Sequence, residues 1–313
     1  MKISKICAIA LICSTSGCTT INRLALNKVA DALSSGETTF ASDDDPELVK
    51  AAVPFSLKLM ESLLAESPNH RGLLLATASG FTEYGYAFVQ QEADELEQKD
   101  YTAAQALRGR ARRLYLRARD YGLRGLEISH REFESQLRRD PKRAIRRATA
   151  QDVPLLYWTA ASWAAAISLS KDNPDLIADL PIVEVMMDRA LELNEAFDGG
   201  SIHGFLITYE MAREGGEGDP AERSRRHFER AQEISNGQLA GPFVSLAEAV
   251  ALAKQDRKEF VALLNRALEV KVDARPEWRL VNLLMQRRAR WLLNRADELI
   301  LEQDKPQTNN NQK

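Results

Sequence analysis

The sequence predicts an all-α protein whose helices pair into repeating hairpins. No segment alternates apolar and polar residues as a half-buried strand would, and apolar residues recur at spacings of three and four along most of the chain. Three helix ends read alike, and their alanines, Ala190, Ala231 and Ala267, lie 41 and then 36 residues apart. Such a period is typical of helix-hairpin solenoids. We expect degenerate tetratricopeptide-like (TPR-like) repeats closing into one compact domain, although the Trp-Leu-Gly-Tyr half of that pattern is absent.

Residues 1–17 are predicted to be a secretory signal peptide. Lys2 and Lys5 precede a short apolar run, and small residues follow it directly before Cys18. A cysteine after Ser-Gly resembles a bacterial lipobox, which implies cleavage before Cys18 and lipidation of its thiol; the alternative is an ordinary signal peptide with a chance cysteine. Thr19 rather than Asp follows Cys18, so resemblance to sorted lipoproteins favours the periplasmic face of the outer membrane over the inner membrane.

Cysteine content and charge limit the possible partners. Cys7 and Cys13 lie within the predicted signal peptide, so the processed chain has no second thiol for a disulfide. Without Lys2 and Lys5 it carries 40 basic and 45 acidic residues, a net charge of −5, which gives no reason to expect nucleic acid. The charge is uneven: residues 108–147 hold 14 basic residues and five acidic ones.

The remaining chain divides into three parts. Residues 18–45 are expected to form a tether with a short amphipathic helix over 21–33, residues 46–303 the repeat domain, and residues 304–313 a disordered polar tail. In the domain, Pro46 begins a first helix ending near Ser67. A second runs from Leu73 towards Lys99, and Asp100 is the expected N-cap of a long third helix. Residues 138–141 mark a break.

The least polar long segment is a predicted hairpin between residues 152 and 203. Its first helix is apolar on nearly every side and should be buried. Asp152 is the expected N-cap, and Pro154 is tolerated in the first turn. The second helix covers about 181–194 and is followed by Gly199-Gly200. Five further helices are expected, over about 201–211, 220–235, 242–254, the segment around 260–267, and 276–302.

The sequence contains no convincing catalytic or metal-binding motif. None of the four histidines has another ligand at a metal-binding spacing. His203 follows a glycine pair at a helix start, where it would either satisfy the backbone or meet a ligand. The loop 215–218 lacks the Lys-Ser/Thr ending of a phosphate loop. We therefore expect a protein that is not an enzyme and has no cofactor.

Two groups of residues are candidates for binding. The arginine-rich helix presents either a solvated, internally paired face or a contact surface for an acidic partner protein or an anionic ligand, with anionic lipid as a third possibility. Aromatic side chains form either core or the lining of an amphipathic pocket. The candidate partner or anion contacts are Arg108, Arg112 and Arg117, and the candidate ligand- or pore-lining residues are Tyr84, Tyr86, Tyr157, Trp158, Trp163 and His203.

Several motifs occur together in a recognisable order. They are Tyr157-Trp158 followed by Ser162-Trp163-Ala164-Ala165; Lys171-Asp172; Ala178-Asp179-Leu180-Pro181; Gly199-Gly200-x-x-His203; His227-Phe228-x2-Ala231; Ser235-Asn236-Gly237; and Leu280-x-Asn282-x5-Arg288-Ala289-x-Trp291-Leu292-Leu293. With them the sequence resembles the T component associated with TRAP transporters. That resemblance implies a periplasmic lipoprotein of cryptic helical-hairpin repeats that forms a trimer. It also implies a pore-like channel in each protomer and a TRAP-type solute-binding protein as partner. It transfers no catalytic residue.

Two functional hypotheses follow. In the first, the protein is a lipid-anchored accessory that exchanges a small hydrophobic or anionic solute with a periplasmic solute-binding protein. In the second, it is a TPR-like scaffold of envelope assembly without a small-molecule site. An enzyme would require clustered titratable groups in a pocket, which nothing in the sequence predicts.

Overall fold

The computed structural model describes Lys28 and residues 39–301, and these residues form helices and no strands. The all-α prediction is confirmed. The helices fall into two compact units, the first over residues 47–194 and the second over residues 41–46 and 195 onward. The predicted signal peptide, Cys18, the helix expected over 21–33 apart from Lys28, and the polar tail after residue 303 lie outside the described residues.

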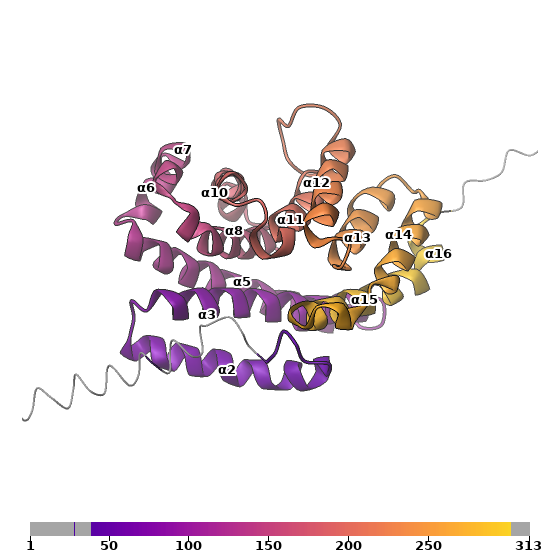
Figure 1. Cartoon of the computed structure of the whole chain (residues 1–313), viewed down its shortest axis with the longest axis horizontal. Coiled ribbons are helices and arrows are strands. Elements are labelled where there is room, and N and C mark those ends of the chain that lie inside the picture. The colour runs from indigo at the N-terminus through magenta and orange to yellow at the C-terminus, as the bar shows by residue number, and fades with distance from the viewer. Residues whose placement is uncertain (1–27, 29–38, 302–313) are drawn as a thin grey trace, which may run out of the picture. The chain divides into compact units, whose positions relative to one another are not determined.

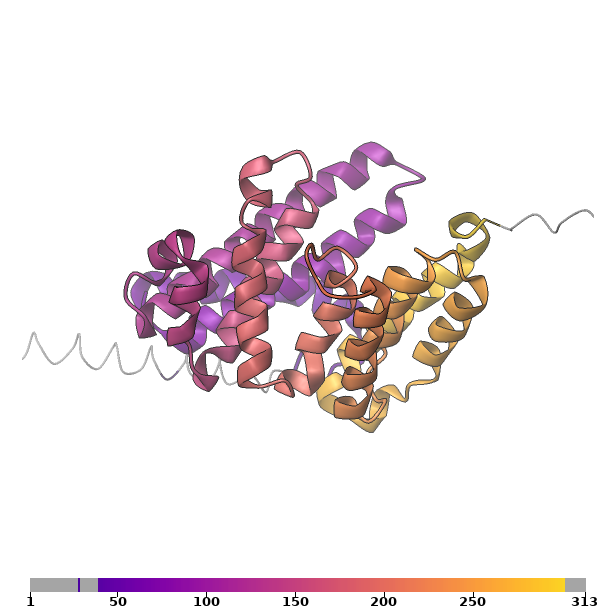
Figure 2. The same ribbon diagram turned by 90° about the horizontal axis from the view of Figure 1, so that it is seen from above.

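The first unit is built around α5 (Tyr101–Ser129), its longest helix, and α8 (Val153–Ser168), both labelled in Figure 1. α5 packs against α3 and α8, and α8 packs against α10. Figure 2 shows the same helices from above. The elements of this unit are α2 (Pro46–Glu66), α3 (Arg71–Tyr84), the π-helix η1 (Gly85–Gln90), α4 (Gln91–Leu96), α5 (Tyr101–Ser129), α6 (Phe133–Arg139), α7 (Pro141–Ala144), the 3₁₀ turns η2 (Ile145–Arg147) and η3 (Ala150–Asp152), α8 (Val153–Ser168), α9 (Pro174–Ile177) and α10 (Leu180–Leu193).

The long helix expected after Leu73 is present but contains a π turn, η1. Its first residue, Gly85, lies against the ring of Tyr115 from α5, where a β-carbon would stand 2.9 Å from Cε1. Tyr115 is completely buried, and its hydroxyl donates to Oε1 of Gln90 at 2.7 Å. A π turn locally widens the helix. The chain thereby passes around a large side chain that the local sequence pattern does not reveal.

The α5–α8 contact depends on two glycines of α5. A β-carbon on Gly122 would stand 2.1 Å from Oγ1 of Thr159, and one on Gly125 would stand 2.7 Å from Leu155. Both distances are shorter than any tolerable contact. The glycines therefore let the backbone of α5 approach α8 more closely than a side chain would permit.

Asp152 occupies the N-cap position of α8 as predicted, but its side chain makes no capping hydrogen bond there. Its Oδ2 accepts hydrogen bonds from the backbone N–H and the hydroxyl of Thr149 and contacts Nε2 of His130 at 2.9 Å. Its Oδ1 accepts from Arg71 at 3.0 Å. Burial raises the pKa of Asp152, but the hydrogen bonds from Thr149 and His130 outweigh it, and the net pKa is lowered. The carboxylate thus joins the start of α3, the end of α5 and the start of α8.

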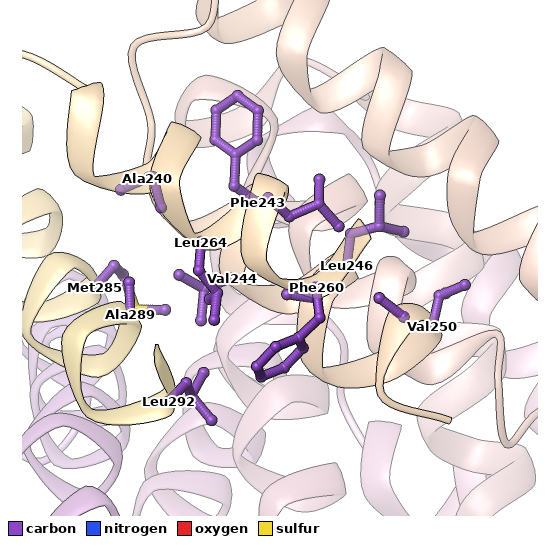
Figure 3. Close-up of a cluster of buried hydrophobic side chains, with 14 of the residues drawn as sticks. Ala240, Phe243, Val244, Leu246, Val250, Phe260, Leu264, Met285, Ala289 and Leu292 are labelled. Carbon is purple, nitrogen blue, oxygen red and sulfur yellow. The ribbon is translucent and has the colours of Figure 1, made fainter. Parts of the chain in front are cut away.

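The helices of the second unit surround an apolar core. Val244, Leu264 and Ala289 lie close together in Figure 3, and all three are completely buried. Its elements are the 3₁₀ turn η4 (Phe197–Gly200), α11 (Ser201–Tyr209), α12 (Pro220–Ser235), α13 (Gly241–Leu246), the π-helix η5 (Ala247–Ala251), α14 (Arg257–Glu269), the 3₁₀ turns η6 (Val272–Ala274) and η7 (Pro276–Trp278), α15 (Arg279–Asn294) and α16 (Ala296–Leu299).

The C-terminal end differs from the expected single helix over 276–302. It begins with the 3₁₀ turn η7 and is interrupted at Arg295, whose ψ of 7° lies outside the helical range. The three repeated alanines all lie in helices and are buried: Ala190 in α10, Ala231 in α12 and Ala267 in α14. Buried alanines at equivalent helix ends agree with paired helices, while the TPR-like character stays a prediction.

Candidate functional site

Three arginines of α5, spaced seven residues apart, form a row on the surface of the first unit. Arg110, Arg117 and Arg124 are all exposed, and each guanidinium lies over an aromatic ring. The distances from Cζ to the ring centroid are 5.7 Å for Arg110 over Tyr84, 5.3 Å for Arg117 over Phe81, and 5.3 Å for Arg124 over Tyr121. Seven residues are nearly two helical turns, so the three side chains share one side of α5. We call this row the arginine ladder.

The rings beneath the ladder join α3 to α5. Phe81 of α3 stacks on Tyr121 of α5 with centroids 6.2 Å apart and planes 6° from parallel. The Tyr121 hydroxyl donates to Oε1 of Glu61 at 2.9 Å, and burial together with this bond raises the pKa of Tyr121 to about 12. Tyr121 is therefore a protonated donor at neutral pH. The aromatic layer is fixed by its own contacts and supports the cations from below.

A shallow hollow of about 380 Å³ opens beside the ladder. It contains four charged groups, one tyrosine and one leucine, and its three cations outnumber its single carboxylate. Asp120, that carboxylate, already accepts two hydrogen bonds from Arg119. The lining residues are Arg113, Leu116, Arg117, Asp120, Tyr121 and Arg124. The hollow can hold carboxylate or phosphate oxygens, which arginine binds with its planar fork of donors.

The three arginines predicted to contact a partner or anion have different surroundings in the structure. Arg108 is engaged internally, since it donates to Asp94 at 3.1 Å and to Glu97 at 2.7 Å. Arg117 belongs to the ladder and also lies 3.4 Å from Glu61. Arg112 is half-buried on α5 outside the ladder. Sequence reasoning missed Arg110 and Arg124, although their spacing of seven from Arg117 was visible in the sequence.

The six residues predicted to line a ligand site are divided between the two units. Trp163 is completely buried and Tyr157 nearly so, whereas Trp158 is half-buried. Tyr84 is buried in α3, and Tyr86 in η1 is 39% exposed. His203 belongs to α11 of the second unit. Trp163 also lies under two guanidinium groups, those of Arg119 at 5.1 Å and Arg138 at 5.4 Å.

Neither of two hollows on the described part of the first unit is lined by any of those six residues. The one beside the ladder is lined by α5, and a second of about 280 Å³ is lined by Lys142, Ile145, Arg146, Val185, Asp188, Arg189 and Glu192. Tyr157 and Trp158 contact each other edge to face, with centroids 5.0 Å apart. In this structure Tyr157 and Trp163 contribute to the core, and a ligand-lining role for the six residues stays a prediction.

In the second unit, His203 of α11 meets His227 of α12. Their Nδ1 atoms lie 2.9 Å apart, and Nε2 of His203 lies 3.4 Å from Oε2 of Glu195, a contact too long for a strong hydrogen bond. The turn η4, which precedes α11, contacts both α11 and α12; its Gly199 has a φ of +64°, and a β-carbon there would stand 2.7 Å from the Trp278 ring. The two histidines are 24 residues apart in the sequence, so no local sequence pattern predicts their contact.

Both histidines of this pair are biased towards the neutral form. Burial lowers the pKa of His203, and burial together with the neighbouring His203 lowers the pKa of His227 to about 4. A short contact between two neutral Nδ1 atoms requires one donor and one acceptor. His227 as the donor fits better, since His203 then carries its proton on Nε2, facing the carboxylate of Glu195. Hydrogen bonding from Arg230 lowers the pKa of Glu195 to about 2, so that carboxylate is charged.

Two further properties concern the described part of the chain. Within it, no three His, Cys, Asp or Glu side chains gather as a metal ion would require. None of its helices has the length and apolarity needed to span a membrane.

The chain is similar to proteins of one transport-related family. A profile of the TRAP transporter T-component family matches residues 42–300, which covers both units. An uncharacterized protein of Treponema pallidum (strain Nichols) is 30% identical over 267 residues, which are 84% of this chain and 83% of that protein. The match extends from the segment before α2 to the end of α16 and includes the ladder and the histidine pair. The chain therefore belongs to the TRAP transporter T-component family.

Proposed function

We propose that the protein is a lipid-anchored periplasmic accessory of a TRAP-type transport system and that it binds a periplasmic solute-binding protein. The observation that carries this proposal is the family match over residues 42–300. Cys18, at the end of a signal-peptide pattern, supports a lipid anchor, and Thr19 after it favours the periplasmic face of the outer membrane. The protein works by binding and not by catalysis. Its assembly into a trimer and the passage of a small hydrophobic or anionic solute through a pore complete the proposal.

Co-purification from native membranes tests the partner. The full-length chain with a C-terminal affinity tag is solubilised in mild detergent, and the proteins that accompany it are identified by mass spectrometry. A TRAP-type solute-binding protein should be enriched over a control in which another lipoprotein carries the tag. Recovery of outer-membrane assembly components in its place would contradict the proposal.

The anchor and the trimer have separate tests. Cys18→Ser should move the protein from the membrane fraction to the soluble periplasmic fraction without changing its unfolding midpoint, because the lipid and not the folded domain holds it on the membrane. Light scattering of the delipidated protein should give three times the protomer mass. A soluble wild-type protein or a monomer would contradict these two parts of the proposal.

The second candidate function is a TPR-like scaffold in envelope assembly without a small-molecule site. The shallow, open form of the two hollows in the first unit favours it, since small-molecule sites are usually concave enough to bury most of their ligand. Native mass spectrometry of protein purified from its own cells separates the candidates. A solute-passing accessory should retain a small organic molecule, and a scaffold should show protein mass alone.

A further inference from the structure

We propose that the arginine ladder of α5, formed by Arg110, Arg117 and Arg124, is the docking surface for a row of carboxylates on a partner protein. This inference rests on the proposed function for the identity of the partner, a solute-binding protein, but not for the chemistry of the surface. The seven-residue spacing, the ring beneath each guanidinium and the exposure of all three cations carry it.

The length of the ladder identifies the class of occupant. Fourteen residues separate Arg110 from Arg124, which corresponds to about 21 Å along the axis of α5. A small solute could meet one or two of these cations but not all three. A helix or an elongated acidic surface carrying carboxylates about 10 Å apart could meet each of them in turn, since residues seven apart on a helix have that separation. The ladder therefore fits a macromolecular partner.

The aromatic rings prepare the cations for binding. An exposed arginine loses side-chain entropy when it is immobilised in an interface. Here each guanidinium already rests on a ring, at 5.3 to 5.7 Å from the centroid, and Arg124 also donates to the carbonyl of Pro68 at 3.0 Å. An arginine has five N–H donors, so such contacts leave several to meet a carboxylate. Part of the side-chain entropy that binding would remove is therefore already lost in the free protein.

The surrounding charges favour a protein over an anionic membrane surface. Asp120 is 61% exposed at the side chain beside Arg117, and Glu61 accepts hydrogen bonds from Lys58 and Tyr121 near the same arginine. A uniformly negative lipid surface would place charge over these carboxylates as well as over the arginines. A partner with discrete carboxylates can place them over the three arginines and avoid the acidic groups between them.

Site-specific photo-cross-linking in the native cells tests the surface. Arg113 lines the hollow beside the ladder, is exposed and is not part of the row. In one variant of the full-length protein, p-benzoylphenylalanine replaces Arg113. In a second variant it replaces Lys258, an exposed residue of α14 in the second unit. Adducts are then isolated, and the attached segment is mapped by mass spectrometry. Position 113 should yield an adduct with one protein at a segment of recurring Asp or Glu, and position 258 should not.

Neutralising the ladder, beside a matched control, tests whether the adduct at position 113 depends on the three arginine charges. Arg110→Gln, Arg117→Gln and Arg124→Gln in combination should reduce the adduct at position 113 by about tenfold or more, as expected for loss of several interfacial charge contacts. Arg131→Gln, Arg139→Gln and Arg143→Gln remove the same charge from exposed positions of the same unit and should leave the yield within about twofold. Circular dichroism confirms that both variants remain helical. If the ladder variant unfolds, Arg117→Gln alone replaces it, with an expected loss of about threefold or more.

Each of the other outcomes overturns the inference. These are an adduct only with phospholipid, no adduct at position 113, an equal yield after the ladder is neutralised, and an equal loss in the matched control. The proposed function can fail separately. If the partner cross-linked through the ladder is acidic but is not a solute-binding protein, the docking surface stands and the TRAP assignment of the partner falls. If a solute-binding protein co-purifies but forms no adduct with position 113, the TRAP assignment of the partner stands and the docking surface falls.

Discussion

The α3–α5 surface of the first unit and the α11–α12 contact of the second unit use polar side chains in opposite ways. On α5, arginines lie over aromatic rings and keep their charge at the surface. Between α11 and α12, Glu210 and Arg223 pair in the interior with 4% and 8% of their surface exposed, and His203 faces His227. The first arrangement leaves cations available to a partner, and the second satisfies its charges internally.

That difference separates residues important for recognition from residues important for stability. An exposed cation gains little from the folded state and can be removed at small cost, whereas removing one member of a buried pair leaves the other charge stranded. Variants of the α11–α12 contact should therefore affect folding. Variants of the ladder should affect binding far more than folding.

The largest effect on stability is expected for Arg223→Ala. Arg223 donates through Nε to Glu210 at 2.5 Å and through its other nitrogens to the carbonyls of Glu210 and Gly218. Its loss leaves a buried carboxylate with Arg213 as the remaining partner, so the free energy of unfolding should fall by about 3–5 kcal/mol. Urea denaturation measures it. Arg257→Ala, which removes an exposed pair with Asp297, should cost less than about 1 kcal/mol, and equal losses would refute the contrast.

A close second is Gly122→Ala in α5. The added β-carbon would overlap Thr159, whose hydroxyl and backbone both lie within contact range, so we expect a loss of about 2–3 kcal/mol from overpacking between α5 and α8. Gly109→Ala in the same helix is the control. Its β-carbon would stand 3.7 Å from Nη1 of Arg113, an ordinary van der Waals contact, and alanine should add about 0.5–1 kcal/mol because it is the better helix former. The same sign for both variants would disprove the close-contact role of Gly122.

The histidine pair should make stability sensitive to mild acid. Both histidines have lowered pKa values in the folded protein, so the unfolded chain binds more protons below its own histidine pKa, near 6.5. The contribution of the pair to the free energy of unfolding is therefore fully present above that pH. It is lost as the pH drops towards about 4, the pKa of His227. Because His227 is only partly buried, we expect a loss of about 1 kcal/mol between pH 7 and pH 5.

His227→Gln isolates that contribution. The variant removes the titrating group at 227 and its repulsion of a charged His203, so its unfolding free energy should change about 1 kcal/mol less than the wild type over the same pH interval. The groups around the pair, Glu195, Glu210, Arg213, Arg226 and Arg230, are the same in both proteins. Parallel pH profiles for the two proteins would rule out the pair as a proton-sensitive element.

The smallest effect on stability is expected for Arg117→Gln. The side chain is about half exposed, and its ring contact and ion pair lie at the surface. We expect its removal to cost less than about 1 kcal/mol. Thermal unfolding of this variant beside Arg223→Ala measures the contrast directly. A loss as large as that of Arg223→Ala would make Arg117 a structural residue.

Local sequence patterns predicted most of the fold because helix boundaries depend on nearby residues. Asp100 caps α5 as expected, Asp219 caps α12, and Asn236 ends α12 with a left-handed backbone. The side-chain role of Asp152 was missed because its carboxylate bonds back to Thr149 and across to Arg71 and His130, which lie 81 and 22 residues away. The break at Arg295 was missed because the apolar spacing continues across it.

The candidate sites were less predictable because they depend on contacts between distant helices. The composition of α5 indicated a basic surface, but only the structure separates Arg108, which pairs with Asp94 and Glu97, from the ladder. Likewise, the sequence places His203 near a glycine pair, but its contact with His227 requires α11 and α12 to be packed together. The π turn at Gly85 reflects the position of Tyr115, a residue of another helix.

The most direct test of recognition by the ladder is the salt dependence of association with the co-purified solute-binding protein. Association rates are measured by stopped flow for the wild type and for the Arg110→Gln, Arg117→Gln, Arg124→Gln variant between about 20 mM and 500 mM NaCl, a range that shortens the screening length several-fold. The wild-type rate should fall about tenfold or more as salt screens the cations, while the variant should be slow and nearly independent of salt. A wild-type rate that does not change with salt, or a variant that matches the wild type, would contradict the account.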